Sequence, residues 1–164
     1  MSAKIEPLLT VSDLDALPDD GNRYELFDGE IYVSRAPSLS HQIILANLLT
    51  KLKIYLESNP IGQAIPTPGV IFSEYDGAIP DLIFISEHGF RKLVLEEKIN
   101  GAPELVIEIV SPGKQNARRD RVIKRQVYGK YGVKEYWIVG SGETGSGGLS
   151  TKETKFGDGR HADG

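Results

Sequence analysis

The segment 38–58 carries the apolar repeat of an amphipathic helix. Ile44, Leu48 and Leu52 recur every four residues, and the charged residues fall outside this row. Side chains four residues apart lie on one face of a helix, so the spacing predicts a single helix here. Pro60 predicts its end, because proline cannot continue a helix.

Apolar runs bounded by turn residues predict the strands. Residues 23–34 contain two such runs on either side of Asp28-Gly29, which is a strong signal for a β-hairpin. Further strands are predicted at residues 69–74, 79–86, 103–112 and 136–139. The run PELVIEIVSP at 103–112 is the most apolar of them. It predicts a central strand that is buried on both faces.

Three more helices complete the predicted elements. They are expected at residues 9–17, at 89–97, and in a basic segment after residue 112 that ends at Gly132. A hairpin followed by alternating helices and strands predicts an α/β domain with a mixed sheet. We assign this single domain to residues 1–139, since 164 residues are too few for two domains of ordinary size. Residues 140–164 are rich in glycine and poor in apolar side chains, so we expect a disordered tail there.

The composition restricts the class of protein. With 40% apolar and 26% charged residues, the chain has the balance of a soluble globular protein. No apolar run is long enough to span a membrane, and the N-terminus lacks the pattern of a secretory signal. We therefore expect a cytoplasmic protein without membrane contact. The absence of cysteine excludes disulfides, thiolate metal sites and cysteine nucleophiles.

The distribution of charge is more informative than its sum. A formal net charge of −4 gives no overall case for binding nucleic acid. Between Lys114 and Lys130, however, seven basic residues face one acid, Asp120. We therefore expect one basic helix on an acidic domain. The candidates on this helix for contacts with nucleic acid are Arg118, Arg121 and Arg125.

Three carboxylates fall within predicted strands, namely Glu25, Asp81 and Glu108. An isolated acid in a strand more often faces solvent at a sheet edge. That interpretation is weaker for Glu108, because its neighbours on both faces of the strand are apolar. A buried carboxylate is costly unless it is paired or bound to a cation. Glu108 therefore requires a partner.

A pair of carboxylates on neighbouring strands suits a divalent cation. Mg²⁺ and Mn²⁺ prefer hard oxygen ligands, and such an ion can polarise a phosphodiester and activate a water molecule. A nearby amine would stabilise the developing charge. Lys124 is the candidate, because Asp120, Lys124 and Tyr128 share one helix face. A surface ion pair between Asp120 and Lys124 is the simpler alternative.

His41 stands at the start of the helix predicted at 38–58. A histidine there is most often a cap or a surface residue. A second interpretation places it in the same cleft, against a phosphate or a ligand carboxylate. Three scattered histidines and no cysteine argue against a zinc site, and no glycine-rich phosphate-binding loop precedes a helix.

Several of these motifs together resemble the Uma2 family. The resemblance is carried by Tyr24-Glu25-Leu26, Asp28-Gly29-Glu30, His41, Pro80-Asp81-Leu82, residues 103–112, Asp120, Lys124, Tyr128, Gly132-Val133 and Glu135-Tyr136-Trp137-Ile138-Val139. It covers roughly residues 8–139, and the order and spacing of the motifs make it specific. Members are assigned to the PD-(D/E)XK nuclease superfamily. The resemblance therefore implies a restriction-endonuclease-like core, with a central mixed sheet flanked by helices.

The resemblance also implies roles for individual residues. Asp81 and Glu108 would be the motif carboxylates and the ligands of Mg²⁺ or Mn²⁺. Glu25 would be an additional acid near the metal. The sequence departs from the superfamily pattern at Val110, where a lysine is expected. Lys124, on the following helix, is the matching position within this family.

We therefore expect a metal-dependent endonuclease that hydrolyses phosphodiester bonds, with DNA as the expected nucleic acid. Asp81, Glu108, Lys124 and Glu25 would form its catalytic site. His41 would contact the nucleic acid together with the three arginines of the basic helix.

Two other functions stay open on the sequence. The same fold could be a non-catalytic module that binds nucleic acid or a protein, which Val110 in place of lysine favours. A carboxylate-pair hydrolase acting on a glycoside would leave Lys124 and the basic helix without a role. A homodimer is also open, since nothing in the sequence identifies an interface.

Overall fold

The strands of the protein form two sheets. The computed structural model describes residues 7–110, 117–141 and 149–156. Within these residues one sheet has six strands and the other has five, and each contains one parallel pair of strands. The predicted mixed sheet flanked by helices is confirmed, but its strands divide between two sheets rather than one.

The five-stranded sheet has the strand order β11-β10-β9-β6-β3. Its strands are β3 (Gly62–Pro66), β6 (Leu82–Ser86), β9 (Leu105–Val110), β10 (Glu135–Ser141) and β11 (Leu149–Lys155). β9 and β10 run parallel, whereas the other neighbouring strands are antiparallel. β9 lies at the centre, as its apolar sequence predicts.

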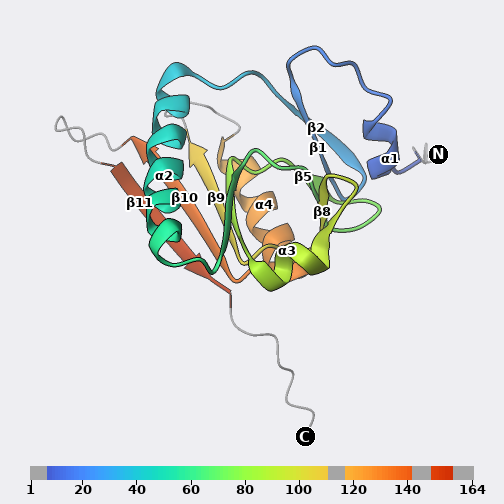
Figure 1. Cartoon of the computed structure of the whole chain (residues 1–164). Helices are drawn as coiled ribbons and strands as arrows, with labels where there is room; N and C mark the ends of the chain where they lie inside the picture. Colours follow the sequence, from blue (N-terminus) through green and yellow to red (C-terminus); the bar gives the residue numbers. More distant parts are fainter. Residues whose placement is uncertain (1–6, 111–116, 142–148, 157–164) are drawn as a thin grey trace, which may run out of the picture.

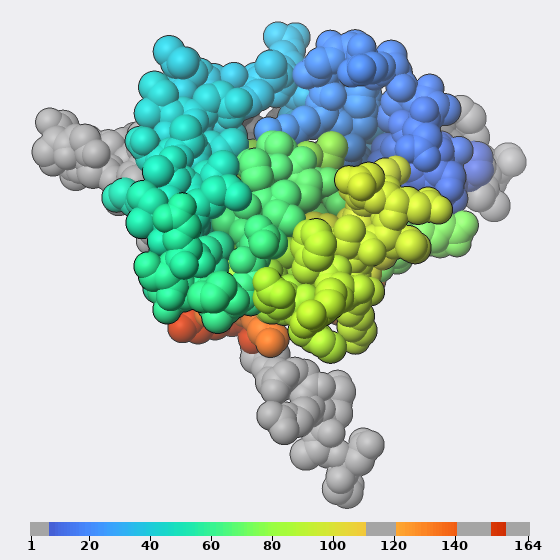
Figure 2. Space-filling model, in the orientation of Figure 1, coloured from blue at the N-terminus to red at the C-terminus, as the bar shows by residue number. Residues whose placement is uncertain are grey.

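Two helices cover the opposite faces of this sheet, α2 (Leu39–Ser58) and α4 (Ala117–Tyr131) (Figure 1). The side chains of β9 alternate between them. Val106 packs in one cluster with Val127 of α4, and Ile107 packs in another with Leu45 of α2. In the space-filling view α2 and the segments after it cover one face, and the C-terminal strands show only at its lower edge (Figure 2). β9 is therefore shielded on both faces, as predicted.

The six-stranded sheet has the order β2-β1-β5-β4-β8-β7. Its strands are β1 (Arg23–Phe27), β2 (Glu30–Ser34), β4 (Val70–Ile71), β5 (Gly77–Ala78), β7 (Val94–Leu95) and β8 (Lys98–Asn100). Phe27, Val70 and Ile99 join the core cluster that contains Val127 of α4. This shared core brings β1 next to α4 and the five-stranded sheet.

Local sequence signals place two of the turns and caps. Asp28 and Gly29 both have positive φ, 50° and 74°, which is the backbone of a type I′ hairpin turn, so the predicted hairpin is confirmed. Ser38 caps α2, because its hydroxyl accepts a hydrogen bond from the amide of His41 at 3.3 Å. This cap fixes where His41 stands in the first turn.

The remaining helices are α1 (Val11–Leu14) and α3 (Glu87–Leu93). α3 starts two residues earlier than predicted, because the Ser86 hydroxyl accepts from the Gly89 amide and caps it. It also ends earlier, because Glu96 and Glu97 have positive φ and form the turn between β7 and β8. None of the helices in the described ranges is long and apolar enough to cross a membrane.

The C-terminal segment differs from its prediction. β11 lies within residues 140–164, where the sequence predicts a disordered tail, and it pairs antiparallel with β10 from Leu149 to Lys155. Backbone hydrogen bonds to an exposed strand edge do not require apolar side chains, which is why composition alone is misleading here. Phe156 follows the strand and packs against the core that contains α4. Residues 142–148 and 157–164 lie outside the described part of the chain.

Candidate active site

Asp81, the residue just before β6, lies across from Glu108 on the neighbouring strand β9. β6 and β9 are antiparallel, and their register pairs Leu82 with Ile107. One step along this register brings Asp81 opposite Glu108, and strand alternation places both on the face that α4 covers. Only 2% of Asp81 and 7% of Glu108 is exposed. Both acids are predicted site residues, and the fold brings them together.

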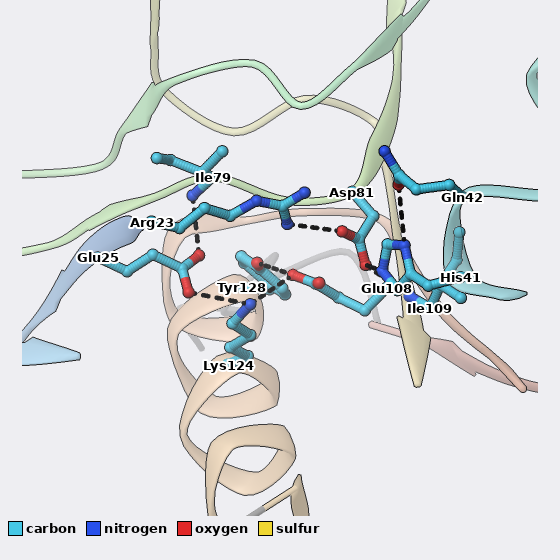
Figure 3. Close-up of polar contacts among 10 residues, drawn as sticks. All are labelled: Arg23, Glu25, His41, Gln42, Ile79, Asp81, Glu108, Ile109, Lys124 and Tyr128. Carbon is cyan, nitrogen blue, oxygen red and sulfur yellow. Dashed lines mark hydrogen bonds and ion pairs between the residues drawn. The ribbon is translucent and has the colours of Figure 1, made fainter. Parts of the chain in front are cut away.

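Three donors hold the Asp81 carboxylate (Figure 3). The Arg23 guanidinium donates to Oδ1 at 2.7 Å, and the amide of Ile109 donates to Oδ2 at 2.8 Å. His41 Nε2 lies 3.1 Å from Oδ2. Burial by itself would raise the pKa of Asp81, but the hydrogen bonds from His41, Arg23 and Ile109 lower it to about 2. Asp81 is therefore a carboxylate at neutral pH.

His41 is bound on both ring nitrogens. Nε2 faces Asp81, and Nδ1 lies 3.2 Å from Oε1 of the neighbouring Gln42. Both partners accept hydrogen bonds, so the ring donates twice only as an imidazolium. The hydrogen bond with Asp81 raises the pKa of His41, although burial opposes it. The surroundings of His41 therefore favour its protonated form.

Glu108 is held by two residues of α4. The Lys124 ammonium donates to Glu108 Oε1 at 3.0 Å, and the Tyr128 hydroxyl donates to the same oxygen at 2.7 Å. Because the two donors are four residues apart on one helix, one face of α4 supplies both. Burial raises the pKa of Glu108 to about 7, nearby carboxylates add to the rise, and the Lys124 charge opposes it.

Glu25 joins the site from the other sheet. It stands on β1, and its Oε1 accepts a hydrogen bond from the amide of Ile79 at 2.8 Å. Its Oε2 lies 3.2 Å from Lys124 Nζ, so Lys124 bridges Glu25 and Glu108. Burial would lower the pKa of Lys124, but these two carboxylates raise it above its ordinary value. The amine is therefore a permanent cation between two acids.

The sequence model of one family, Uma2, described as "Putative restriction endonuclease", matches residues 11–144. The chain belongs to the Uma2 family. The match contains every residue of the site described above, and the resemblance predicted from the motifs is confirmed.

One solved structure resembles this Uma2 chain over most of its length. It is described as a "putative nuclease belonging to DUF820" from Anabaena variabilis ATCC 29413. The TM-score is 0.66 at 18% sequence identity, over 90% of this chain and 84% of that chain. At this identity the likeness shows a common fold. No curated protein matches the chain by sequence.

The predicted nucleic-acid contacts divide into three groups. His41 lies inside the site, against Asp81. Arg125 is exposed on α4, and Arg121 is half-buried and interacts with other groups of the protein. Arg118 belongs to α4, but its side chain lies outside the described part of the chain. Their contacts with nucleic acid stay predictions.

Two residues of the site were not predicted. Arg23 stands two residues before Glu25 on β1, so strand alternation places both side chains on the same face of β1, toward Asp81 and Glu108. That spacing is a signal, but it acquires meaning only once Glu25 is known to face the site. Tyr128 was placed on the same helix face as Lys124, yet without a role. Its hydroxyl proves to share an acceptor with the lysine.

Acidic and basic side chains occur in equal number in the site. The acids are Glu25, Asp81 and Glu108, and the bases are Arg23, His41 and Lys124. Buried charges are tolerated when they are paired and hydrogen-bonded, and this network meets both conditions.

The donor chemistry of Asp81 and Glu108 fits a hard divalent cation. In the described residues no three His, Cys, Asp or Glu side chains form a group that could hold a metal ion. Mg²⁺, however, commonly uses one or two protein carboxylates and keeps several waters. Two adjacent carboxylates fit that mode of binding, and they do not fit a fully protein-ligated ion.

A buried hydroxyl lies beside the same residues. Tyr136 on β10 is fully buried, and its OH has no hydrogen-bond partner among the described residues. Its ring packs edge-on against Tyr128, with centroids 5.2 Å apart. Burial raises the pKa of Tyr136, and the charge of Glu108 adds to that effect. The phenol therefore stays protonated and can donate.

Proposed function

We propose that this Uma2 protein is a Mg²⁺- or Mn²⁺-dependent nuclease that hydrolyses phosphodiester bonds of nucleic acid, with DNA as the substrate. The observation that carries the proposal is the convergence of Asp81, Glu108 and Lys124 from three separate elements of the fold. Lys124 Nζ reaches Glu108 Oε1 at 3.0 Å although a valine fills the strand position two residues after Glu108. This contact between a helix-borne lysine and a strand-borne acid supports the role proposed for Lys124.

Asp81 and Glu108 would hold the metal, and Glu25 would stand near it. When bound, a divalent ion would polarise the phosphodiester and lower the pKa of the attacking water. Glu108 is the acid whose charged form burial disfavours most clearly, so a cation beside it would stabilise its carboxylate. These assignments rest on the donor set and on the family.

The protein side chains would supply orientation and charge. Lys124 would stabilise the negative charge that develops on the phosphate as the water oxygen bonds to phosphorus. The bond from phosphorus to the leaving sugar oxygen then breaks, and that oxygen takes up a proton. Tyr128 would fix the orientation of Glu108 through its hydrogen bond to Oε1. The exposed basic residues of α4, such as Arg125, would contact phosphates sequence-independently.

The test is cleavage of supercoiled plasmid and of single-stranded DNA and RNA, with Mg²⁺, Mn²⁺ or EDTA. The wild-type protein should convert DNA only when a divalent ion is present. Asp81→Asn and Lys124→Met should each reduce the rate by at least about a hundredfold, the size of effect seen when one transition-state contact is removed. The matched surface variants Asp19→Asn and Lys53→Met should cleave like the wild type.

Two results would contradict the proposal. Cleavage that persists in both site variants would locate the activity elsewhere, and cleavage in EDTA would exclude the metal. Faster hydrolysis of RNA than of DNA would replace the substrate and leave the site assignment intact.

A non-catalytic binding module is the second candidate. It is favoured by the occupancy of Asp81, since both of its oxygens already accept hydrogen bonds and the site balances its own charges. Such a protein should bind a labelled DNA duplex equally well in Mg²⁺ and in EDTA, as measured by fluorescence anisotropy. It should also leave plasmid DNA intact with every divalent ion tested.

A further inference from the structure

Arg23 occupies one of the two oxygens that the proposed metal ligand Asp81 offers. Its NH1 lies 2.7 Å from Asp81 Oδ1. Oδ2 is already engaged by the amide of Ile109 and by His41. A cation that binds Asp81 through Oδ1 must therefore displace the guanidinium. Figure 3 shows Arg23 reaching over the site from β1 toward this oxygen.

Of the three basic side chains in the site, Arg23 is the least enclosed. The exposed fraction of its side chain is 22%, against 15% for Lys124 and 8% for His41. Lys124 is also fixed by two carboxylates, and His41 by Asp81 and Gln42. Arg23 has one described acceptor in the site. It is the cation that can move with the smallest loss of contacts.

Charge balance favours the movement of one cation. The guanidinium of Arg23 and the ammonium of Lys124 already face the three acids, so a divalent ion added to the intact network would set four positive charges against at most three negative ones. Moving Arg23 outward removes one of these charges and opens Oδ1 in the same step. An arginine at the rim of a metal site is well suited to a phosphate, because its planar fork binds two phosphate oxygens at once.

We propose that Arg23 is an exchangeable counter-ion of Asp81, which holds Oδ1 in the metal-free protein and contacts a phosphate of the nucleic acid once a divalent ion has displaced it. The inference rests on the proposed function. Its consequence is that metal and nucleic acid bind cooperatively. A phosphate that draws Arg23 away from Asp81 favours the metal, and by linkage the metal favours the phosphate equally.

The first measurement is the affinity for Mn²⁺ alone, by titration calorimetry without nucleic acid. Arg23→Gln should bind Mn²⁺ more tightly than the wild type, by roughly fivefold or more, because the competing cation has gone. A purely structural arginine would give the opposite sign, since Asp81 would lose its orientation. Arg35→Gln removes the same charge from an exposed position after β2 and should not change the affinity.

The second measurement is the coupling between the two ligands. In the wild type, a DNA duplex with hydrolysis-resistant phosphorothioate linkages should tighten Mn²⁺ binding by roughly fivefold or more. In Arg23→Gln this tightening should disappear. In Arg23→Lys the charge remains without the planar fork, so part of the coupling should remain. Thermal unfolding followed by circular dichroism checks that each variant is folded.

The outcomes separate the inference from the proposed function. In one outcome the wild type binds Mn²⁺, Asp81→Asn does not, and folded Arg23→Gln and Arg23→Lys bind Mn²⁺ no more tightly than the wild type. In that case Arg23 is not an exchangeable counter-ion, and the metal site stands. Loss of Mn²⁺ binding in folded Arg23→Gln also overturns the inference. If Asp81→Asn does not change Mn²⁺ binding, the metal site and the role of Arg23 fall together.

Discussion

Lys124 on α4 reaches Glu108 on β9 across a distance of 3.0 Å between Nζ and Oε1. They are 16 residues apart in sequence, on the consecutive elements β9 and α4. Val110 stands where a lysine was expected, but the site does not lack an amine. Lys124 of α4 supplies one from the same face of the sheet. The electrostatic consequences of this contact can be measured.

Replacing Lys124 by methionine is expected to destabilise the protein by about 3–5 kcal/mol, because Glu108 and Glu25 stay buried without the cation between them. The loss should grow from about pH 6 to about pH 8.5. Without Lys124 the pKa of Glu108 in the folded state rises further above its unfolded value, so ionisation at higher pH opposes folding. Urea unfolding followed by the fluorescence of Trp137, the only tryptophan, measures this.

Lys53→Met is the matched control for that experiment. Lys53 is exposed on α2, so its loss should change the free energy of unfolding by no more than about 0.5 kcal/mol. A loss below about 1 kcal/mol for Lys124→Met at both pH values would mean that the ion pair contributes little, as a surface pair does.

Two buried tyrosines should respond differently to removal of their hydroxyls. Tyr128→Phe deletes the hydrogen bond to Glu108 and should cost about 1–3 kcal/mol, because the acceptor is a buried carboxylate. Tyr136→Phe removes a buried OH that has no partner among the described residues, and it should be neutral or stabilising. Equal losses in the two variants would show that the hydroxyl of Tyr136 is hydrogen-bonded in solution.

Acid should weaken the fold through Asp81. The pKa of this carboxyl falls from 3.8 to about 2 on folding. A carboxyl with a lowered folded pKa contributes stability above its unfolded pKa and loses it as the pH falls through the folded pKa. The window is therefore about pH 4 to pH 2, and the contribution is about 2 kcal/mol.

Asp81→Asn removes this dependence and identifies its source. Between about pH 5 and pH 2.5 the free energy of unfolding should fall by about 2 kcal/mol more in the wild type than in Asp81→Asn. The control variant Asp19→Asn, at an exposed position, should follow the wild type. Parallel pH profiles for all three proteins would assign the acid sensitivity to other carboxyls.

Asp76 lies outside the proposed site and should matter for stability alone. It is 1% exposed, and it accepts hydrogen bonds from the Asp28 amide at 2.9 Å and from the Tyr131 hydroxyl at 2.5 Å. Asp76→Ala should cost about 3–5 kcal/mol because these donors lose a buried acceptor. The affinity of this variant for Mn²⁺ should stay within about twofold of the wild-type value, since the polar partners of Asp76 in the described part of the chain do not include Asp81 or Glu108.

Asp15→Ala provides the comparison for Asp76. Asp15 pairs with Lys98 at 3.3 Å, but both side chains are largely exposed. Its removal should change stability by less than about 1 kcal/mol. A similar loss for both variants would mean that burial is not what makes Asp76 important.

Local chemistry accounts for the elements that the sequence predicted correctly. The turn at Asp28-Gly29 depends on two adjacent residues that accept positive φ, and the face of α2 depends on a repeat within one helix. β9 could be recognised because its six residues are almost all apolar. In each case the information lies within a few residues of the element itself.

The missed strands have the opposite character. β5 and β7 contain two residues each, and β8 contains three, so they carry no usable period. β11 is polar and is held by pairing with the edge of β10. Such strands exist because a partner lies beside them, and that partner is fixed only when the chain has folded.

The sequence by itself determined that Asp81 and Glu108 are carboxylates in apolar strands, and it identified Lys124 as the nearest amine with a suitable helix face. A buried charge requires a partner, and that requirement can be read without coordinates. Only the tertiary structure decided which partners are used. Register sets Asp81 opposite Glu108, the packing of α4 carries Lys124 and Tyr128 to one oxygen, and the approach of β1 places Arg23 on Asp81. Each of these contacts joins separate elements, and their distances depend on how the two sheets and the helices pack together.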